Sequence, residues 1–181
     1  QATALTTLRR ADAAQKAVAA WRRGGLLPMD ETTLLTFYRD RLSSDDHDAR
    51  MNALLWQGET SQAERQISFV STGRRPGFME RLALLQGAAP GSLGVPTDAG
   101  LMRDPGYVYN RAVQARKSGN LPGAISLLAN RAPLTRPALE PEKWVRELLT
   151  AAKGAGADPA VRIASSIDEA FTPGTDVSKL S

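Results

Sequence analysis

The sequence predicts an all-α protein, arranged as a tetratricopeptide-like α-superhelix of stacked antiparallel helix pairs. Alanine and leucine dominate the chain and aromatic residues make up only 6% of it, a composition that favours close helix–helix packing over a sheet core. No segment alternates apolar and polar residues over a strand length with hairpin turns around it. Glycines that end predicted helices recur at intervals of 29 to 35 residues.

Composition limits the class of protein further. The 181 residues, 42% of them hydrophobic, suit one helical array, which we place at residues 1–172, followed by a polar tail at 173–181. The chain has no cysteine, which excludes disulfides and thiol catalysis. No apolar run is long enough for a membrane span. The net charge of +4 comes from short arginine pairs, so we expect no nucleic-acid partner, and a weakly anionic surface or polymer stays open.

The first predicted helix covers residues 3–23, which include no glycine or proline. Several of its side chains fall loosely on one face: Leu5, Leu8, Ala11 or Asp12, Gln15 and Val18. Gly24 and Gly25 end this helix, and Pro28 follows shortly after.

Four more helices are predicted before residue 90. Asp30 caps a short helix with apolar residues at positions 34, 35, 37 and 38. Ser44, with two aspartates after it, begins a helix that ends at Gly58. The sequence Ser-Gln-Ala-Glu at 61–64 has the form of a capping box and begins another helix. A helix through Phe78 and Leu85 then ends at Gly87.

The second half repeats this pattern after a loop-like stretch at 87–94. Asp104 begins a helix that ends at Gly119, and Asn120 begins the next. Residues 142–153 form a helix with an apolar face made of Trp144, Val145, Leu148, Leu149 and Ala152. Asp158 and Pro159 open a last helix whose apolar positions include Val161.

The glycine spacing defines a repeat. The five glycines that end helices are separated by 33, 29, 32 and 35 residues: Gly25, Gly58, Gly87, Gly119 and Gly154. After three of them an alanine sits early in the following helix: Ala63, Ala124 and Ala160. Helix–turn–helix units of this period are typical of tetratricopeptide-like solenoids. The alternative is an irregular helical bundle that uses glycine to stop its helices, and the recurring alanine favours the superhelix.

One cluster invites a catalytic or metal-binding interpretation. His47, the only histidine, lies beside Asp45, Asp46 and Asp48. All four fall in the first turn of a predicted helix, where acidic residues are favoured electrostatically. We therefore interpret them as a solvated capping cluster.

The arginine pairs and the tryptophans can each be interpreted as ligand-binding residues or as structural residues. Arg22–Arg23 and Arg74–Arg75 could hold an anion, but solvated cations at helix ends explain them more simply. Trp21, Trp56 and Trp144 lie on apolar helix faces, which favours packing over carbohydrate stacking. The sequence contains no common phosphate-binding, zinc-protease or serine-hydrolase motif. It thus predicts no catalytic, cofactor-binding or metal-binding residue and assigns no substrate-binding residue.

Four segments carry a resemblance to a known family. The sequences at 20–28, 45–56, 104–119 and 141–144 resemble the N-terminal superhelical domain of soluble lytic murein transglycosylases. The family often has a second tryptophan after the one that matches Trp144, where this chain has Val145.

The resemblance implies a function. In that family a lysozyme-like domain C-terminal to the superhelix cleaves peptidoglycan through a glutamate in a Glu-Ser motif, and this chain contains no Glu-Ser dipeptide. We expect the non-catalytic scaffold portion of a periplasmic lytic transglycosylase, with peptidoglycan or a cell-wall protein as partner and the catalytic domain outside this chain. An independent tetratricopeptide-like adaptor that binds a protein segment is the alternative.

Overall fold

The computed structural model describes residues 2–172 and residue 174 of the chain. These residues form nine α-helices and three short 3-10 helices without any strand, which confirms the all-α class. No helix in this described part is long and apolar enough to cross a membrane. The predicted tail at 173–181 lies outside the described residues, apart from Gly174. The chain divides into two compact units, Gln1–Met79 and Glu80–Ser181.

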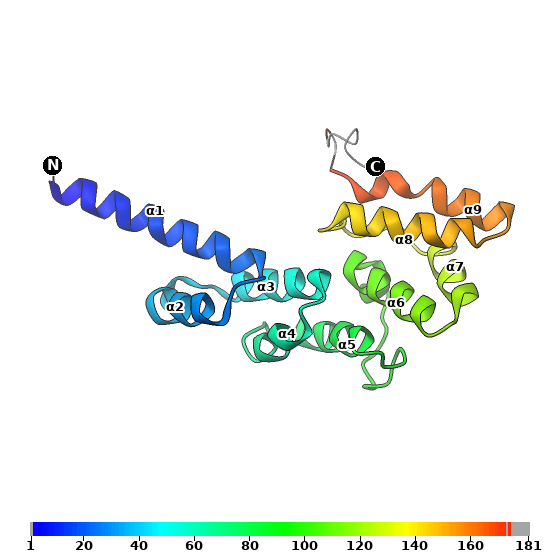
Figure 1. Cartoon of the computed structure of the whole chain (residues 1–181), viewed down its shortest axis with the longest axis horizontal. Helices are drawn as coiled ribbons and strands as arrows, with labels where there is room; N and C mark the ends of the chain where they lie inside the picture. The colour runs from blue at the N-terminus through cyan, green and yellow to red at the C-terminus, as the bar shows by residue number, and fades with distance from the viewer. Residues whose placement is uncertain (1, 173, 175–181) are drawn as a thin grey trace. The chain divides into compact units, whose positions relative to one another are not determined.

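The first unit is built from four helices and the start of a fifth. Its elements in chain order are α1 (Ala2–Arg23), α2 (Pro28–Tyr38), the 3-10 helix η1 (Arg39–Arg41), α3 (Ser44–Gln57), α4 (Thr60–Gln66) and the first part of α5 (Arg75–Leu85). Helix α1 packs against both α2 and α3, and α3 packs against α4 (Figure 1). Each helix therefore has a neighbour close to it in the sequence.

The face of α1 that is buried differs from the predicted one. Ala17 and Trp21, one helical turn apart, are buried where α1 packs on α3. Of the predicted face, Ala11, Asp12 and Gln15 are exposed and Val18 is half-buried, and the side chains of Leu5 and Leu8 lie outside the described residues. The prediction failed because α1 carries apolar residues on two sides, and periodicity cannot tell which side meets the partner.

Helix α2 lies largely at the surface. It contains no buried residue, and Phe37 is 74% exposed. Asp30 lies in its first turn instead of capping it, because Leu27 is the cap and Pro28 the first helical residue. Proline at that position loses no hydrogen bond, which explains the start of the helix.

The ends of α3 follow from local chemistry. The Ser43 hydroxyl accepts a hydrogen bond from the Asp46 backbone and the Asp46 carboxylate accepts one from the Ser43 backbone, so the cap is Ser43 and not Ser44. Gly58 ends α3 in the left-handed conformation at φ 82°, which glycine adopts without steric cost. The predicted capping box at 61–64 is wrong, because α4 begins one residue earlier and Glu59 makes no side-chain cap.

The second unit contains four further helices. After the remainder of α5 come η2 (Leu101–Arg103), α6 (Pro105–Lys117), α7 (Leu121–Ala129), α8 (Pro141–Lys153), α9 (Ala157–Ala164) and η3 (Ile167–Ala170). Helix α6 packs against α7. Helices α8 and α9 lie side by side and run in opposite directions (Figure 1).

The predicted start of α6 at Asp104 is confirmed. Close to this start lies a buried arginine of α5, Arg81. The Asp104 carboxylate accepts a hydrogen bond from the Tyr107 backbone and caps the helix. Arg81, 2% exposed, donates from its Nε to the Asn110 side chain at 2.9 Å. Its guanidinium occupies the space where Gly106 would otherwise carry a Cβ atom. Glycine at 106 is therefore required for this close approach.

Helices α8 and α9 are correctly placed, but their buried faces are narrower than predicted. Trp144 and Leu148 are fully buried, whereas Leu149 is 47% exposed. In α9 Ile163 is fully buried and Val161 is 67% exposed. The apolar side of each helix includes residues that its neighbour does not cover.

A partly buried ion pair joins α6 to α8. Glu147 is buried within the apolar face of α8 and accepts two hydrogen bonds from Arg116, at 2.9 and 2.8 Å. The fork geometry satisfies both carboxylate oxygens, which burial would otherwise penalise.

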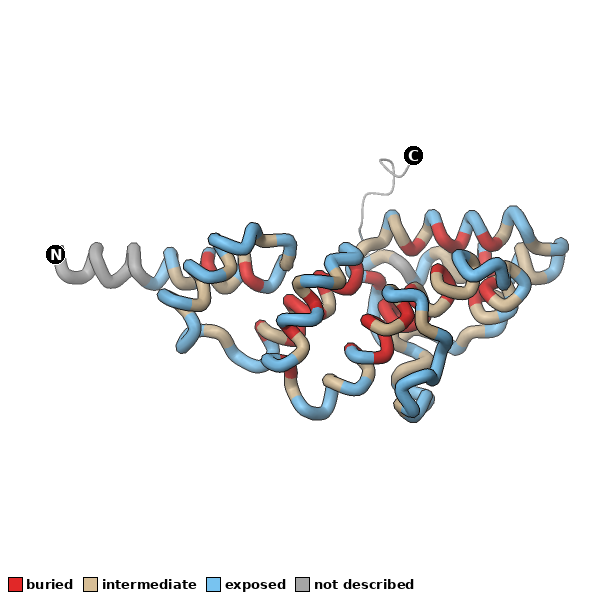
Figure 2. The backbone as a smooth tube through the Cα atoms, turned by 60° about the horizontal axis from the view of Figure 1, so that its bottom comes forward, coloured by how far each residue is buried: buried red, intermediate tan, exposed pale blue. Residues whose placement is uncertain are grey.

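Buried residues recur along one side of a helix, with exposed residues on the other (Figure 2).

The neighbouring leucines of α8 test this assignment. Leu148→Ala should lower the free energy of unfolding by about 2–5 kcal/mol, because it leaves a cavity in a packed core. Leu149→Ala should change it by less than about 0.5 kcal/mol, since that side chain is at the surface. Urea unfolding followed by circular dichroism measures both, and equal losses would contradict the placement of α8.

Candidate functional site

The acidic residues around His47 do not form one site. The Asp46 carboxylate is bonded to Ser43 and to Arg22 of α1, at 2.5 Å from the guanidinium. The Asp48 carboxylate accepts hydrogen bonds from the Ser71 backbone and hydroxyl, at 2.9 and 2.7 Å. No group of three or more potential metal ligands occurs among the described residues.

The predicted solvation of this cluster is wrong. Asp46 is 7% exposed and Asp48 only 2%, whereas Asp45 is exposed. The sequence could not show this, because the partners that cover the two carboxylates come from distant segments. The capping role predicted for these residues is confirmed only for Asp46.

His47 is part of an aromatic stack. Its ring meets Trp21 edge-on at 5.6 Å between centroids and lies nearly parallel to Phe69 at 5.3 Å. The Gln66 amide lies 3.2 Å from Nδ1, and because an amide nitrogen can only donate, Nδ1 is the acceptor. Burial lowers the pKa of His47, and the nearby charges of Asp46 and Asp48 only partly oppose that shift. The ring is therefore neutral at pH 7.

The arginine pairs are only in part the solvated cations that were predicted. Arg22 and Arg74 are about half exposed, but each faces a carboxylate of α3: Arg22 contacts Asp46, and Arg74 lies 3.8 Å from Asp48. Arg75 donates to the backbone carbonyl of Val70. These side chains tie segments together, so they are not open anion sites.

The tryptophans are packing residues, as predicted. Trp21 and Trp144 are fully buried and Trp56 is 2% exposed. None of the three rings has the open face that stacking on a sugar needs. Carbohydrate stacking on these tryptophans is therefore excluded in this conformation.

Sequence reasoning missed the most buried charge of the first unit. Arg50 is completely buried, with its guanidinium 4.1 Å from the centre of the Trp21 ring. It donates to the Trp21 carbonyl and the Gln62 side chain, and it lies 3.4 Å from the Glu31 carboxylate. Burial lowers the pKa of Arg50, and the charge of Glu31 opposes that shift. The sequence signal was weak: an arginine among apolar helix residues.

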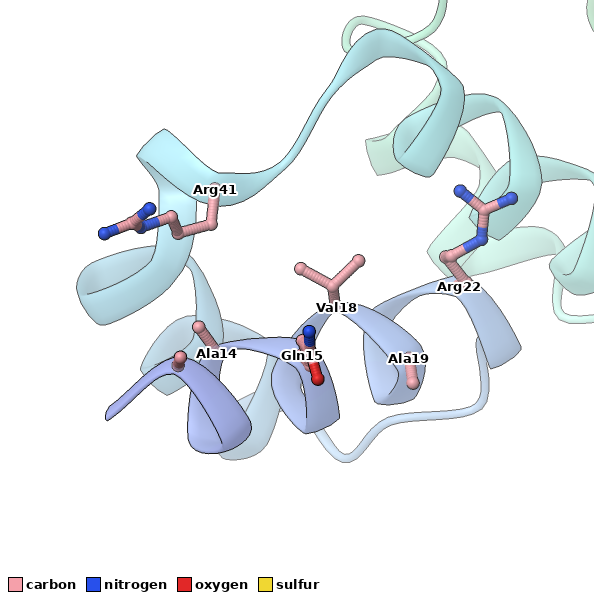
Figure 3. A pocket seen from close by; sticks show the side chains of 7 residues that line it. Ala14, Gln15, Val18, Ala19, Arg22 and Arg41 are labelled. Atoms are coloured by element: carbon pink, nitrogen blue, oxygen red, sulfur yellow. The ribbon is translucent and has the colours of Figure 1, made fainter. Parts of the chain in front are cut away.

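An open groove of about 670 Å³ runs along α1 in the first unit. Its lining residues come from α1, with one from η1: Ala11, Ala14, Gln15, Val18, Ala19, Arg22 and Arg41. Val18 points into the hollow between the two arginines, which stand at its ends (Figure 3). The volume falls in the range of ligand sites, about 300–1,000 Å³.

A smaller groove of about 340 Å³ lies in the second unit, between η2 and the end of α7. Its polar lining groups are already bonded within the protein. Arg131 donates to Glu169 at 2.7 Å, Asn130 to the Ser126 carbonyl and Arg103 to the Pro133 carbonyl. This groove offers mainly apolar contact.

Comparison with protein-family models, curated protein sequences and solved structures finds no match for this chain.

Asp46 gives a pH-dependent test of the α3 cap. Burial alone would raise the pKa of Asp46, but hydrogen bonds from Ser43 and Arg22 outweigh it, and the pKa lies below its ordinary value of 3.8. The carboxylate therefore stabilises the fold above that value, and this contribution disappears as pH falls through the lowered pKa. Asp46→Asn should cost about 1–2 kcal/mol at neutral pH.

Urea unfolding at pH 7 and again near about pH 2 measures the difference, which should shrink in acid. Asp45→Asn, at an exposed neighbour, is the control and should change stability by less than about 0.5 kcal/mol. A loss for Asp46→Asn that is the same at both pH values would show that the charge is not responsible.

The single histidine allows a direct titration. The His47 ring protons should titrate by nuclear magnetic resonance with a pKa below the ordinary 6.5. Gln66→Leu should raise that pKa, because the lost hydrogen bond favours the neutral ring. A value above 6.5 in the unmodified chain would mean that Asp46 and Asp48 dominate the environment.

Proposed function

We propose that this chain is the non-catalytic superhelical scaffold portion of a periplasmic lytic transglycosylase that acts on peptidoglycan. In this proposal the helix pairs stack as a tetratricopeptide-like array and position glycan strands or partner proteins for a catalytic domain outside the chain. The observation that carries it is that the four segments that resemble the family contain residues on which helix ends and helix packing depend.

These segments share a structural role. Trp21 is buried in the last turn of α1, Asp46 completes the capping box of α3, Asp104 caps α6 and Trp144 is buried in the first turns of α8. A resemblance confined to surface loops would not involve buried or capping residues. This one involves the residues that set where helices begin, end and pack.

Two of the described carboxylates, Asp46 and Glu169, have chemistry that suits a scaffold. Asp46 and Glu169 both have a pKa below the ordinary value. For Glu169 burial alone would raise the pKa, but the hydrogen bonds from Arg131 and the Leu134 backbone and the charge of Arg131 together outweigh it. An acid that protonates a glycosidic oxygen needs a raised pKa, so neither residue is suited to that step.

Charge supports the choice of polymer. The chain carries a net charge of +4, and the stem peptides of peptidoglycan bear carboxylates. A basic protein surface concentrates such a polymer by long-range attraction. The alternative, an adaptor for a protein segment, is favoured by the groove along α1.

Sedimentation with purified sacculi tests the proposal. The chain should pellet with peptidoglycan at low salt, less so as salt screens the charges, and should release no 1,6-anhydro-muropeptides detectable by mass spectrometry. Chitin, a glycan without peptide carboxylates, is the control polymer and should retain less protein. Release of anhydro products would overturn the non-catalytic assignment, and equal absence from both pellets would overturn peptidoglycan binding.

A further inference from the structure

We infer that His47 makes a proton-sensitive contact, which holds the end of α4 and the segment after it on α3. When Nδ1 of the imidazole takes up a proton, the hydrogen bond from Gln66 is lost and residues 66–69 loosen from α3. The inference concerns the first unit alone and does not rest on peptidoglycan binding.

The first step is that Gln66 fixes the protonation state of the ring. The Gln66 side-chain nitrogen lies 3.1 Å from the backbone carbonyl oxygen of His47 and 3.2 Å from Nδ1 of the same residue. A carbonyl oxygen can only accept, so the NH₂ end of the amide faces it. Nδ1 must therefore accept from the same NH₂ group, which leaves the ring proton on Nε2. The contact exists only with a neutral ring.

The second step is that neither side chain can adjust to a charged ring by turning over. If the Gln66 amide turned over, its oxygen would face the His47 carbonyl oxygen, and two acceptors would meet at 3.1 Å. If the imidazole turned over, a ring carbon would replace Nδ1 and the hydrogen bond would still be lost. Gln66 is only 2% exposed, so loss of its partner is costly. A proton on Nδ1 therefore separates the ring from Gln66.

The third step is what the His47 contact holds in place. Gln66 is the last residue of α4, and three residues later the Phe69 ring stacks on the imidazole at 5.3 Å between centroids. Ser71 is attached to α3 separately, through its backbone and hydroxyl bonds to Asp48. Loss of the His47 contact therefore releases residues 66–69 and leaves the attachment at Ser71 in place.

The fourth step is the charge around the ring. Charged groups come from each element that packs there: Asp46, Asp48 and Arg50 of α3, Arg39 of η1, Arg22 of α1, Arg65 of α4 and Arg74 of the segment after α4. Asp46 is paired with Arg22, Asp48 lies 3.8 Å from Arg74, and Arg65 contacts Glu31. The two aspartates are thus partly neutralised and attract a proton to the ring only weakly. Burial is the largest cause of the lowered pKa of His47.

The sign of the pH dependence follows from the two forms of the segment. In the closed form the pKa of His47 lies below 6.5, whereas in an open, solvated form it returns to about 6.5. The open form therefore gains protons first, and opening becomes easier as pH falls from about 6.5 to the lowered pKa of the closed form. A tenfold change in the opening equilibrium corresponds to a difference of about 1 between the two pKa values.

Hydrogen exchange by nuclear magnetic resonance on the full chain tests the inference. The amides of Ile67 and Phe69, which donate to the carbonyls of Ala63 and Gln66, report whether the segment is closed. Their protection factors, corrected for intrinsic exchange, should fall about two- to tenfold between about pH 7.5 and about pH 5. The fall should begin near about pH 6.5 and end at the pKa of the His47 ring titrated in the same sample. The amide of Leu148, in the second unit, is the control and should keep its protection.

Matched variants assign the response to His47, the only histidine of the chain. His47→Asn supplies an acceptor oxygen in place of Nδ1 and does not titrate in this range, so protection should change with pH by less than about twofold. Gln66→Leu should lower protection already at about pH 7.5 and reduce the further fall in acid. Asp45→Asn, at an exposed neighbour, should respond as the unmodified chain does. If His47→Asn fails to fold by circular dichroism, the unmodified chain and Gln66→Leu complete the test.

Three results would overturn the inference. One is protection of Ile67 and Phe69 that stays constant while the ring titrates. Another is protection that rises in acid, because the rings of Trp21 and Phe69 would then hold the charged imidazole in place. The third is a fall that persists in His47→Asn, which would assign it to another group. None of these measurements involves peptidoglycan, so they leave the sedimentation result unaffected.

Discussion

The buried guanidinium of Arg50 holds the first unit together. From α3 it reaches the Trp21 ring and carbonyl of α1, the Gln62 side chain of α4 and the Glu31 carboxylate of α2. Helix α2 buries no residue of its own, and Glu31, which Arg65 of α4 also contacts at 3.1 Å, links it to α3 and α4. One desolvated cation therefore sets the mutual placement of four helices, a role usually left to apolar side chains.

The second unit uses the same means at other joints. Arg116 of α6 forms an ion pair with Glu147 of α8. The nearly buried Arg131, which follows α7, forms an ion pair with Glu169, and its guanidinium lies 5.3 Å from the centre of the Trp144 ring. Few aromatic residues are available to fill a core. Arginine supplies both bulk, through its stem, and fixed geometry, through its planar head. Such contacts favour one arrangement of the helices over others.

Helix ends were predictable from the sequence because they depend on neighbouring residues. Gly58, Gly119, Asp104 and Asn120 act as predicted. The buried faces of the helices were harder to predict. Ala17 and Trp21 of α1 are buried, and the sequence around the buried carboxylates of α3 gave no local sign of their burial. Which side of a helix meets a partner depends on residues far away in the chain. The groove along α1 escaped prediction for the same reason, since three of its lining residues, Ala11, Gln15 and Val18, were assigned to the predicted apolar face.

The contact between Gly106 and Arg81 has a consequence for how this fold can change. A methyl group at 106 would overlap the guanidinium, and moving Arg81 would break its bond to Asn110. A shorter side chain at 81 would leave a void beside the glycine. Neither residue can be replaced alone without loss, so the two positions should vary together or not at all. The residue type at position 106, in the first turn of α6, is therefore constrained by Arg81 in the preceding helix α5.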